Sequence, residues 1–568
     1  MSTNKLQLHE KELFARISEL ELEIKKLKHR KKYGLVWEDK PEDVVLQCQE
    51  NIPILKEVKT RKLVSDNSFP TNILIEGDNY HSLSVLNYTH ASAVDLIYID
   101  PPYNTGATDW KYNNDYVDGN DPWRHSKWVS WMYKRLCLSK RLLKDTGALI
   151  VAIDDYEVNS LGLLLEELFP NYDRSLIIVE HHPQGAGSNT ISRTHEYAYV
   201  CVPEKVGIQG REIVDMDDNW SLKRSGQGEN NWRKNRPRQF FAILVDEANR
   251  KVIGVGPELR RDDKYPTGKN KDGYVMMYPI DKQGGERAWR YGRETMERLI
   301  SKNQIEYSKN GALSVKKTGE KQTPIFSVWK DTRYNAGTSG SNLLADILGS
   351  NKFPYPKSLF TVMDMVNMIV KFNHEALILD FFAGSGTTGH AVLELNKDGG
   401  NRKFILCTNN ENKICEEVTY ERIKRVMKGY KNKKGEKVEG LGGNLSYFKT
   451  DLVGVDKLRR VSDESKIKVT YQAGEMIALR EDTLNEIERN DWWQVFEGDG
   501  KLTAIYFTEN KTKLKELLKI LEKKNQPTTL YIFGWGKNEY KNDYSTHSIR
   551  VEDIPEPILE VYKEINRI

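Results

Sequence analysis

The feature that most constrains the fold is a buried-strand pattern that ends at two consecutive prolines. Apolar and β-branched residues dominate Val94–Ile99, and Asp100, Pro101, Pro102 and Tyr103 follow at once. The strand cannot continue through the prolines, because each lacks an amide hydrogen and has a fixed φ angle. An acid and an aromatic ring are therefore presented at the carboxyl end of a strand, where open α/β sheets bind their ligands.

Strand and helix patterns alternate on both sides of this turn. A strand pattern over 72–76 ends in a Gly-Asp turn, and a helical pattern over 80–89 leads to the strand at 94–99. This alternation predicts an α/β fold built on a parallel sheet. Further helices are expected over 126–144, 154–168 and 357–373, and further strands over 148–153, 175–180, 376–380 and 403–408.

Changes in composition divide the 568 residues into five expected regions. They are an N-terminal helix at 1–32, a core in two halves at 33–182 and 351–450, a basic aromatic region at 183–350, and a mixed α/β domain at 451–568. The N-terminal helix has an a/d seam that suits either packing on its own domain or a helical pair between protomers, so we expect a homodimer. The seam is formed by Leu6, Leu13, Ile17, Leu20, Ile24 and Leu27.

The region at 183–350 combines basic and aromatic side chains. Residues 219–300 hold 18 Lys+Arg and 11 Asp+Glu, a net of +7, whereas the whole chain has a net charge of only +4. Such a surface suits phosphate contacts and base stacking, although a solvated surface around structural tryptophans gives the same pattern. The candidate nucleic-acid contacts, two of them from a long loop at 107–125, are Trp110, Tyr112, Lys223, Arg224, Arg233, Lys234, Arg236, Arg238 and Arg290.

A second turn, rich in glycine, follows a later strand pattern. Gly384, Gly386 and Gly389 fit G-x-G-x-x-G, with Asp380 at the strand end and Phe382 just before the first glycine. Here the backbone can approach a ligand closely at a helix N-terminus. The pattern alone permits a dinucleotide site or a plain tight turn, but it is no Walker A loop, because no Gly-Lys-Ser/Thr follows.

Together the two turns resemble a known enzyme family. Phe382-Ala383-Gly384-Ser385-Gly386 resembles the F-x-G-x-G motif of S-adenosylmethionine-dependent amino-methyltransferases, and Asp100-Pro101-Pro102-Tyr103 resembles their D-P-P-Y motif. The order, catalytic motif first, resembles the β group of these enzymes, a permuted form of the shared fold. Over roughly residues 33–450 the chain resembles the modification (Mod) subunit of type III restriction-modification systems.

This resemblance implies a fold and an activity. The fold would be a permuted, Rossmann-like class I methyltransferase sheet with an inserted target-recognition domain at 183–350 that binds double-stranded DNA. Asp100 and the Pro101 carbonyl would accept the two hydrogens of adenine N6, with Pro102 keeping the turn rigid, and Tyr103 would stack on a flipped-out base. The residues implied to bind S-adenosylmethionine are Asp78, Lys357, Asp380, Phe382, Ala383, Gly384, Ser385, Gly386, Thr387 and Glu411.

Two further stretches qualify the resemblance. The strand at 403–408 is followed by Asn409-Asn410-Glu411, whereas many relatives carry the ribose-binding acid directly at the strand end, so Glu411 would act from a shifted position. Thr194-His195-Glu196-Tyr197 resembles the H-E-Y motif that closes the catalytic region, although packing would equally explain His195 and Glu196.

Several alternatives stay open at this point. Aspartate at position 100 favours adenine N6 over cytosine N4, and no cysteine follows a proline, which argues against cytosine C5. The chain could also be a stand-alone methyltransferase, a DNA-binding specificity subunit with vestigial methylation, or a dinucleotide oxidoreductase.

The remaining expectations concern partners and location. Without a Walker A loop, restriction would need a partner subunit that carries the helicase and nuclease. The five cysteines form no C-x-x-C pair, which predicts no metal site and suits a reducing cytoplasm. No apolar run approaches 18 residues, so no membrane span is expected.

Overall fold

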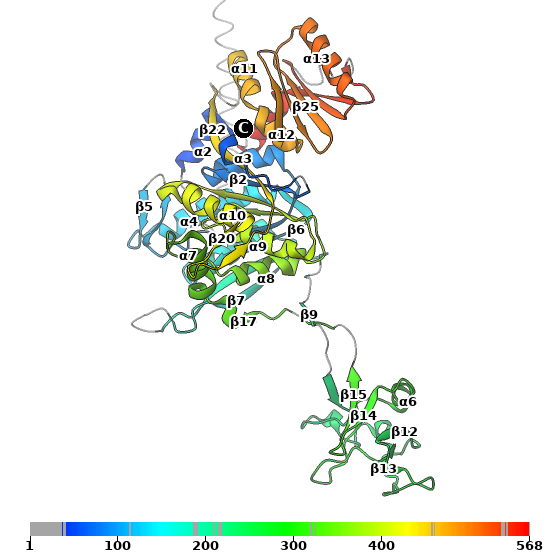
Figure 1. The fold of residues 1–568 in the computed structure, drawn as a ribbon. Coiled ribbons are helices and arrows are strands. Elements are labelled where there is room, and N and C mark those ends of the chain that lie inside the picture. Colours follow the sequence, from blue (N-terminus) through cyan, green and yellow to red (C-terminus); the bar gives the residue numbers. More distant parts are fainter. Residues whose placement is uncertain are drawn as a thin grey trace, which may run out of the picture. The chain divides into compact units, whose positions relative to one another are not determined.

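The computed structural model describes residues 37, 41–66, 68–112, 115–185, 191–206, 208, 211–213, 218–317, 321–323, 325–455, 458, 461–535, 540 and 544–566, without the side chains of 107–116, 211–219 and 317–324. The expected N-terminal helix at 1–32 lies outside these residues. The chain divides into a main unit, Met1–Gln209 with Phe326–Ile568, and an inserted unit, Gly210–Ile325. The ribbon is drawn in Figure 1.

A ten-stranded sheet in the order β1-β22-β2-β19-β18-β3-β6-β8-β7-β17 forms the centre of the main unit. The strands from β2 to β6 in this order are parallel, and β8 runs antiparallel to both β6 and β7. This is the α/β sheet predicted from the sequence, and it confirms the fold class. The strands are β1 (Asn51–Glu57), β2 (Thr71–Glu76), β3 (Val94–Ile99), β6 (Leu143–Ile153), β7 (Tyr172–Glu180), β8 (His195–Pro203), β17 (Val328–Trp329), β18 (Leu377–Asp380), β19 (Lys403–Thr408) and β22 (Asn444–Gly454).

The strand order interleaves the two halves of the core. β2 and β3 follow one another in the chain, yet β19 and β18, some 300 residues later, lie between them. Since these four strands are parallel, their carboxyl ends meet at one edge of the sheet. Asp100 follows β3 at this edge, Asp380 ends β18, and Asp78 follows β2 after one glycine. The fold therefore brings the predicted catalytic and cofactor motifs together.

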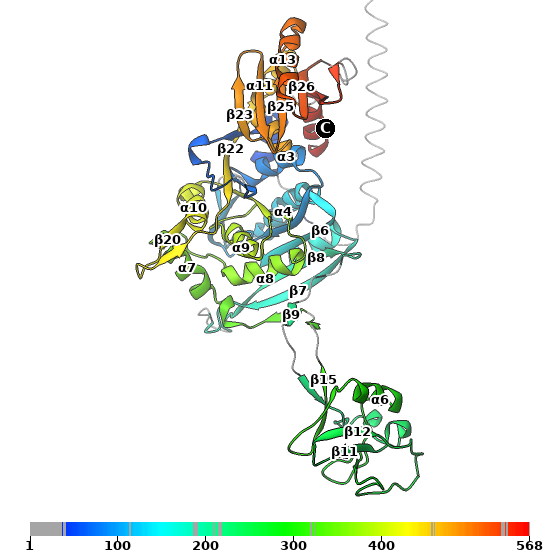
Figure 2. The same cartoon turned by 45° about the vertical axis from the view of Figure 1, so that its right-hand side comes forward.

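Helices cover both faces of the sheet, as expected for strands that are apolar on both sides. α3, α4 and α5 pack on one another, and α8, α9 and α10 pack on the other face, where α8 and α9 lie side by side (Figure 2). A short hairpin, β4 (Ala107–Tyr112) and β5 (Asp115–Asp118), occupies the expected loop after the D-P-P-Y turn. The helices are α2 (Asp43–Glu50), α3 (Asn79–Thr89), α4 (Arg124–Lys140), α5 (Val158–Leu168), α7 (Leu343–Leu348), α8 (Leu359–Val370), α9 (Thr387–Leu395) and α10 (Tyr420–Lys428).

The inserted unit is narrower than the expected region at 183–350. β8 and β17 pair within the main sheet, so the residues before Gly210 and after Ile325 belong to the main unit. The core of the inserted unit includes Phe241, Trp289 and Met296. Its elements are β10 (Asp218–Ser221), β11 (Ile243–Asp246), β12 (Lys251–Val255), β13 (Val275–Met277), α6 (Arg293–Ser301), β14 (Ile305–Tyr307) and β15 (Leu313–Lys317), with β9 (Arg211–Ile213) and β16 (Lys321–Thr323) paired to each other.

The C-terminal residues form a second, five-stranded sheet within the main unit. The hydroxyl of Tyr562 donates to the carbonyl of Pro53 at 2.6 Å, and the guanidinium of Arg480 lies 4.8 Å from the ring centroid of Tyr88, so this sheet is anchored on β1 and α3. Among the described residues, no helix is long and apolar enough to span a membrane. The C-terminal elements are α11 (Asp463–Gln472), α12 (Gly474–Arg480), β23 (Asn485–Arg489), β24 (Trp493–Gly498), β25 (Lys501–Tyr506), α13 (Lys511–Lys524), β26 (Thr528–Phe533), β27 (Ile549–Ile554) and α15 (Glu556–Ile565).

Asn72 provides a test of how the sheet is joined. Its buried side chain donates to the carbonyl of Asn444 at 3.1 Å and accepts from the amide of Phe404 at 2.9 Å, which links three strands. Asn72→Ala leaves both groups unpaired, so we expect the free energy of unfolding of the main unit to fall by about 2–4 kcal/mol. Urea unfolding measures this loss. Exposed Asn485→Ala is the control, and equal stability of the two variants would contradict the prediction.

Candidate functional site

The D-P-P-Y turn is fixed by the residues around it. The hydroxyl of Tyr103 donates to Oδ1 of Asp100 at 2.8 Å, and the indole of buried Trp128 on α4 donates to the carbonyl of Pro102 at 2.7 Å. The Pro102 carbonyl is thus occupied, which leaves the Pro101 carbonyl as the acceptor expected beside Asp100. Two prolines and two side-chain hydrogen bonds make this turn a preorganised element.

The ammonium of Lys357 lies between two carboxylates at this turn. Its Nζ is 3.2 Å from Oδ1 of Asp100 and 2.5 Å from Oε2 of Glu196, and it also contacts the hydroxyl of Tyr103. Oε2 of Glu196 also lies 3.2 Å from this hydroxyl, so Asp100 and Glu196 compete for its single hydrogen. The Lys357 side chain is only 13% exposed, and that of Glu196 only 7%, so the charges are poorly solvated and depend on one another.

Burial and these neighbours shift the pKa values of the cluster. Burial raises the pKa of Asp100 and the charge of Glu196 adds to the rise, while Lys357 opposes it. Burial also disfavours ionisation of Glu196, but the charges of Lys357 and His181 outweigh it, so the pKa of Glu196 lies below its ordinary value. The pKa of Lys357 is raised, because its two carboxylate partners outweigh burial. At neutral pH the cluster therefore holds a charged Lys357 and an ionised Glu196.

Lys357 was predicted to line the cofactor, yet its contacts lie on the catalytic side of the site. Glu196, for which packing was an equal explanation, is a member of the same cluster. Nε2 of His195 lies 3.0 Å from the hydroxyl of Tyr197. The H-E-Y stretch thus contributes its glutamate to the site through the antiparallel strand β8.

The glycine-rich turn has the backbone that its glycines predict. Gly384 and Gly386 have φ angles of +47° and +76°, and a Cβ at either would lie 3.2–3.3 Å from Phe353 or Thr419. Gly386 caps the N-terminus of α9, and the hydroxyl of Thr419 donates to the carbonyl of Gly384 at 2.6 Å. The turn is therefore held close to its neighbours with the helix N-terminus behind it.

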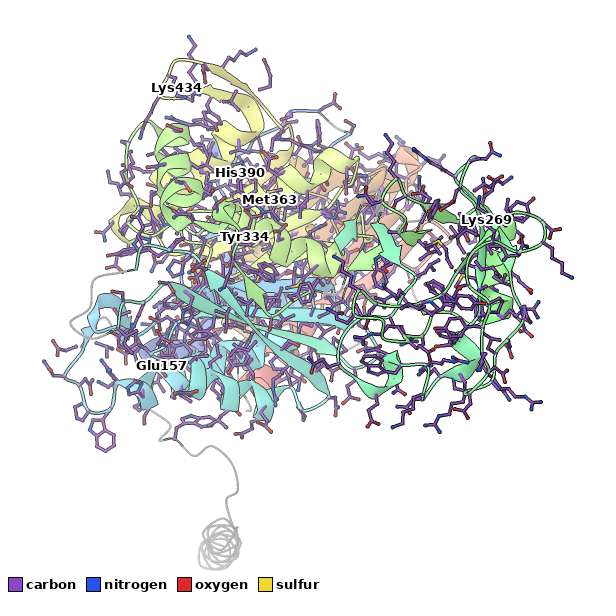
Figure 3. The ribbon with its side chains drawn as sticks, turned by 90° about the horizontal axis from the view of Figure 1, so that it is seen from below. Glu157, Lys269, Tyr334, Met363, His390 and Lys434 are labelled. Atoms are coloured by element: carbon purple, nitrogen blue, oxygen red, sulfur yellow. The ribbon has the colours of Figure 1, made fainter. Side chains whose placement is uncertain are left out.

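The side chains of Ser385 and Thr387 point into the protein, and their expected contact with the cofactor stays a prediction. Both are buried beside Arg422 of α10, whose Nη1 donates to Oγ of Ser385 at 3.1 Å and to Oγ1 of Thr387 at 2.8 Å. Arg422 also reaches Nδ1 of buried His390, labelled in Figure 3, at 3.3 Å. These two hydroxyls therefore hold the turn to α10 through Arg422.

Asp380 supports the turn from the end of β18. Its two oxygens accept from the amide of Phe382 at 2.9 Å and from the hydroxyl of Thr388 at 2.6 Å. Burial raises the pKa of Asp380 to about 7, with the charge of Asp100 adding to the shift and the two hydrogen bonds opposing it. A buried carboxyl that ionises only near neutral pH fits a cationic group bound beside it, as in S-adenosylmethionine.

The turn after β2 is tied to the glycine-rich turn. Asp78 caps α3 by accepting from the amide of Tyr80 at 2.7 Å, and its side chain is 42% exposed. Asn79 donates to the carbonyl of Phe381 at 3.3 Å and accepts from Arg135 at 2.5 Å. The exposed carboxylate of Asp78 is therefore held at the same edge as Asp380, where the sequence predicts contact with the adenine of the cofactor.

Arg135 is a buried support that the sequence analysis missed. Its guanidinium pairs with Glu42 at 2.7 Å and lies 4.3 Å from the ring centroid of Trp131. Trp131 packs on Phe382 of the cofactor motif with 5.3 Å between the ring centroids.

Glu411 is half-buried and opens a short 3-10 turn after β19, and its proposed ribose contact stays a prediction.

Glu157 is the centre of a further buried cluster, which holds Asn104, the residue that directly follows the D-P-P-Y turn. It is fully buried at the start of α5 (labelled in Figure 3) and accepts from the amide of buried Asn104 at 2.5 Å, while Nδ1 of His125 lies 2.6 Å from the same oxygen. Asn104 has a φ of +59°, a conformation that a buried hydrogen bond stabilises. This cluster fixes where the chain leaves the catalytic turn.

The predicted DNA contacts of the inserted unit differ in their exposure. Arg233 is buried, with its guanidinium paired to Glu286 and donating to the carbonyls of Arg260 and Asp263, so it has a structural role in place of the predicted contact. Lys234 and Arg238 are exposed. The half-buried Lys223, Arg224 and Arg290 donate to backbone carbonyls of their own unit, and Arg236 is half-buried. The side chains of Trp110 and Tyr112 lie outside the described residues.

Comparison with known proteins agrees with this geometry. Residues 94–421 match the family described as DNA methylase, with N6 and N4 methyltransferases as its members. The EcoPI Mod subunit of Escherichia phage P1, a type III restriction-modification enzyme, is 30% identical over 73% of this chain and 70% of its own length. The type II methyltransferase M.KpnI of Klebsiella pneumoniae is 32% identical over 59% of this chain and 79% of its own length.

A second Mod subunit and a solved structure are also similar to this chain. The StyLTI Mod subunit of Salmonella typhimurium is 27% identical over 67% of this chain and 59% of its own length. The solved structure of the M1.HpyAVI-SAM complex aligns with 62% of this chain and 98% of its own at 13% identity, but its TM-score of 0.27 is too low to bear on the fold.

The family match covers both turns and every strand between them, including the D-P-P-Y turn and the glycine-rich turn with their observed geometry. The chain therefore belongs to the DNA methylase family, and it is an S-adenosylmethionine-dependent, adenine-N6 DNA methyltransferase similar to the Mod subunits of type III restriction-modification systems.

Proposed function

We propose that this chain is the modification and specificity subunit of a type III restriction-modification system and that Asp100 directs methyl transfer to an adenine rotated out of the DNA duplex. The observation that carries the proposal is the Asp100 carboxylate at the end of β3, held by Tyr103 and Lys357 beside the glycine-rich turn. The Asp100 side chain is only 25% exposed and is held among Tyr103 and Lys357, where the amine of a base stacked in a duplex cannot reach it, so the target would leave the helix.

Asp100 and the Pro101 carbonyl would act as paired acceptors for the target amine. The lone pair of an exocyclic amine is delocalised into the ring, which makes N6 a poor nucleophile. When each N–H of the amine donates a hydrogen bond to one of these acceptors, the lone pair becomes more localised on nitrogen. The rigid turn holds the two acceptors in place. Tyr103, whose hydroxyl is tied to Asp100, offers its ring to the extruded base.

Asp100 is also placed to receive the proton that the amine loses. In the transfer, N6 would bond to the methyl group as the methyl–sulfur bond breaks, the electron pair would pass to sulfur, and N6 would lose one proton. When bound, S-adenosylmethionine supplies the electrophilic methyl group on a positively charged sulfur. The raised pKa of Asp100 makes it a better proton acceptor than an ordinary aspartate, and water then takes the proton.

Lys357 would keep Asp100 ionised until that step. The carboxylates of Asp100 and Glu196 share one ammonium, and without it their repulsion would drive one of them to take up a proton. Lys357 comes from the segment before α8, on the cofactor half of the chain. It is therefore a positioning residue that joins the two halves at the reaction centre.

The inserted unit would recognise the DNA sequence through its exposed basic residues, Lys234 and Arg238 among them. Similarity to Mod subunits supports a restriction subunit as partner. The heptad seam from Leu6 to Leu27 supports a homodimer. A stand-alone enzyme is the second candidate, and the similarity to the type II methyltransferase M.KpnI favours it.

The function can be tested in a methylation-free host. We expect the wild-type chain to place N6-methyladenine in one short, asymmetric motif, and we expect Asp100→Ala to lower methyl transfer at least about 100-fold while S-adenosylmethionine still binds. Modified-base sequencing and tritiated methyl transfer measure the two results. The control is Asp173→Ala, which removes an exposed carboxylate on β7. Methyl marks on cytosine N4, or full activity of Asp100→Ala, would contradict the proposal.

The role of Lys357 gives a second prediction. Lys357→Met removes the shared cation, so kcat should fall at least about 100-fold and the acidic limb of the pH–rate profile should move to higher pH, because the pKa of Asp100 rises further. Adding Glu196→Gln should restore part of the activity, since the unpaired carboxylate is then gone. Exposed Lys352→Met is the control. A double variant no better than Lys357→Met would count against electrostatic coupling.

Asp380 gives a prediction about pH. Only its ionised form attracts a cation, and its pKa is about 7, so affinity for S-adenosylmethionine should rise with pH and weaken about tenfold from pH 8 to pH 6. Asp380→Asn should bind weakly with no such dependence over this range. Isothermal titration calorimetry at several pH values measures both. The same pH dependence in wild type and variant would show that another group titrates.

A further inference from the structure

The hairpin that follows α10 carries a concentration of positive charge that the proposed function does not use. It is formed by β20 (Gly429–Lys431) and β21 (Lys437–Glu439) and projects from the main unit (Figure 2). Residues 421–440 hold eight Lys+Arg and three Asp+Glu, a net of +5, which exceeds the +4 of the entire chain. We call this segment the lysine hairpin.

The lysines of this hairpin are exposed and lack acidic partners. Lys428, Lys431, Lys433 and Lys434 are all exposed, and Lys434 lies at the outer tip in Figure 3. Within the described part of the chain, none of the four forms an ion pair, whereas Lys437 pairs with Glu439 at 2.8 Å. Surface lysines are ordinarily balanced by nearby acids, whereas residues 428–439 hold five lysines and only two acids, Glu436 and Glu439.

The arrangement within the hairpin opposes its own stability. Lys431 and Lys437 are direct cross-strand partners, and like charges placed opposite one another repel. The turn is braced by Asn432, which donates to the carboxylate of Glu436 at 2.8 Å and accepts from the amides of Lys434 and Glu436 at 3.0 and 2.9 Å. A firmly braced turn therefore presents uncompensated lysines, which is a preorganised site for polyanionic charge.

The hairpin is connected through α10 to the glycine-rich turn. α10 carries Arg422, which holds Ser385 and Thr387 of the glycine-rich turn, and Lys428 ends the same helix. A helix of nine residues is about 14 Å long, so the hairpin starts within about that distance of the glycine-rich turn. A duplex that delivers its adenine to Asp100 extends well beyond that distance on either side.

We propose that the lysine hairpin binds the sugar-phosphate backbone of the duplex next to the target base, as a second DNA contact separate from the inserted unit. This inference rests on the proposed function, since it takes DNA as the substrate. Lysine side chains on a rigid turn neutralise phosphates without reading bases. The hairpin would therefore add affinity and fix the register of the duplex at the site, and the inserted unit would supply the sequence preference.

The test compares two variants with the same change in charge. The hairpin variant is K428Q/K431Q/K433Q/K434Q, and the control K515Q/K519Q/K523Q/K524Q neutralises four exposed lysines of α13. Binding is measured between 50 and 200 mM NaCl on an unmethylated duplex that contains the recognition motif and on a duplex in which that motif is scrambled. The slope of log K against log [NaCl] counts the phosphate contacts, at about 0.9 for each.

We expect the hairpin variant to lose a slope of about 2–4 and at least about tenfold in affinity for both duplexes alike, since phosphate contacts are independent of sequence. The control should keep the slope of the wild type, and cofactor affinity, melting temperature and the methylated motif should be unchanged in both variants. An unchanged slope in the hairpin variant, or an equal loss in the control, would overturn the inference. Absence of methyl transfer by the wild type on any DNA would instead refute the proposed function.

Discussion

The shared ammonium of Lys357 is the interaction on which the arrangement of the site depends. Asp100 stands at the end of β3 and Glu196 at the start of β8, and two poorly solvated carboxylates that share one site do not both stay ionised without a cation between them. Lys357 comes from the other half of the core, more than 150 residues after Glu196. Sheet topology brings the two halves side by side, and this charge makes the catalytic turn dependent on the cofactor half.

On the cofactor side, the glycine-rich turn is fixed by a buried cation with neutral partners. Arg422 is fully buried and donates to hydroxyls and a backbone carbonyl of the turn, and burial lowers its pKa to about 9. Arg135 supports the neighbouring turn through Asn79, with Glu42 as its partner. Both arginines lie on helices that pack against the sheet, α10 and α4. The loops at the site thus gain their rigidity from side chains on regular elements, which is what a preorganised site requires.

The parts of this site that could be predicted are those encoded locally. The strand that ends just before Asp100 and Pro101, and the turn around Gly384 and Gly386, are determined by neighbouring residues alone, and the structure contains both. Glu196 was undecided between packing and function, because its role depends on Lys357, which is distant in sequence and adjacent only through the antiparallel strand β8. Arg422 belongs to no recognisable motif, and the sequence alone does not distinguish a buried arginine from an exposed one until the packing of its helix is known. Ser385 and Thr387 stand inside a ligand-binding motif, yet the left-handed glycines beside them turn their side chains inward.

The distribution of charge explains why a nearly neutral chain can act on DNA. The net charges of residues 219–300 and 421–440 are +7 and +5, so the other residues together carry −8 to give the total of +4. Charges in 0.15 M salt act over about 8 Å, so a phosphate responds to the side chains next to it and hardly to the total. Acidic surface elsewhere also disfavours binding in the wrong orientation, because it repels the same backbone. Near-neutrality overall is thus compatible with DNA binding, and concentrating the positive charge in two segments restricts where the duplex is held.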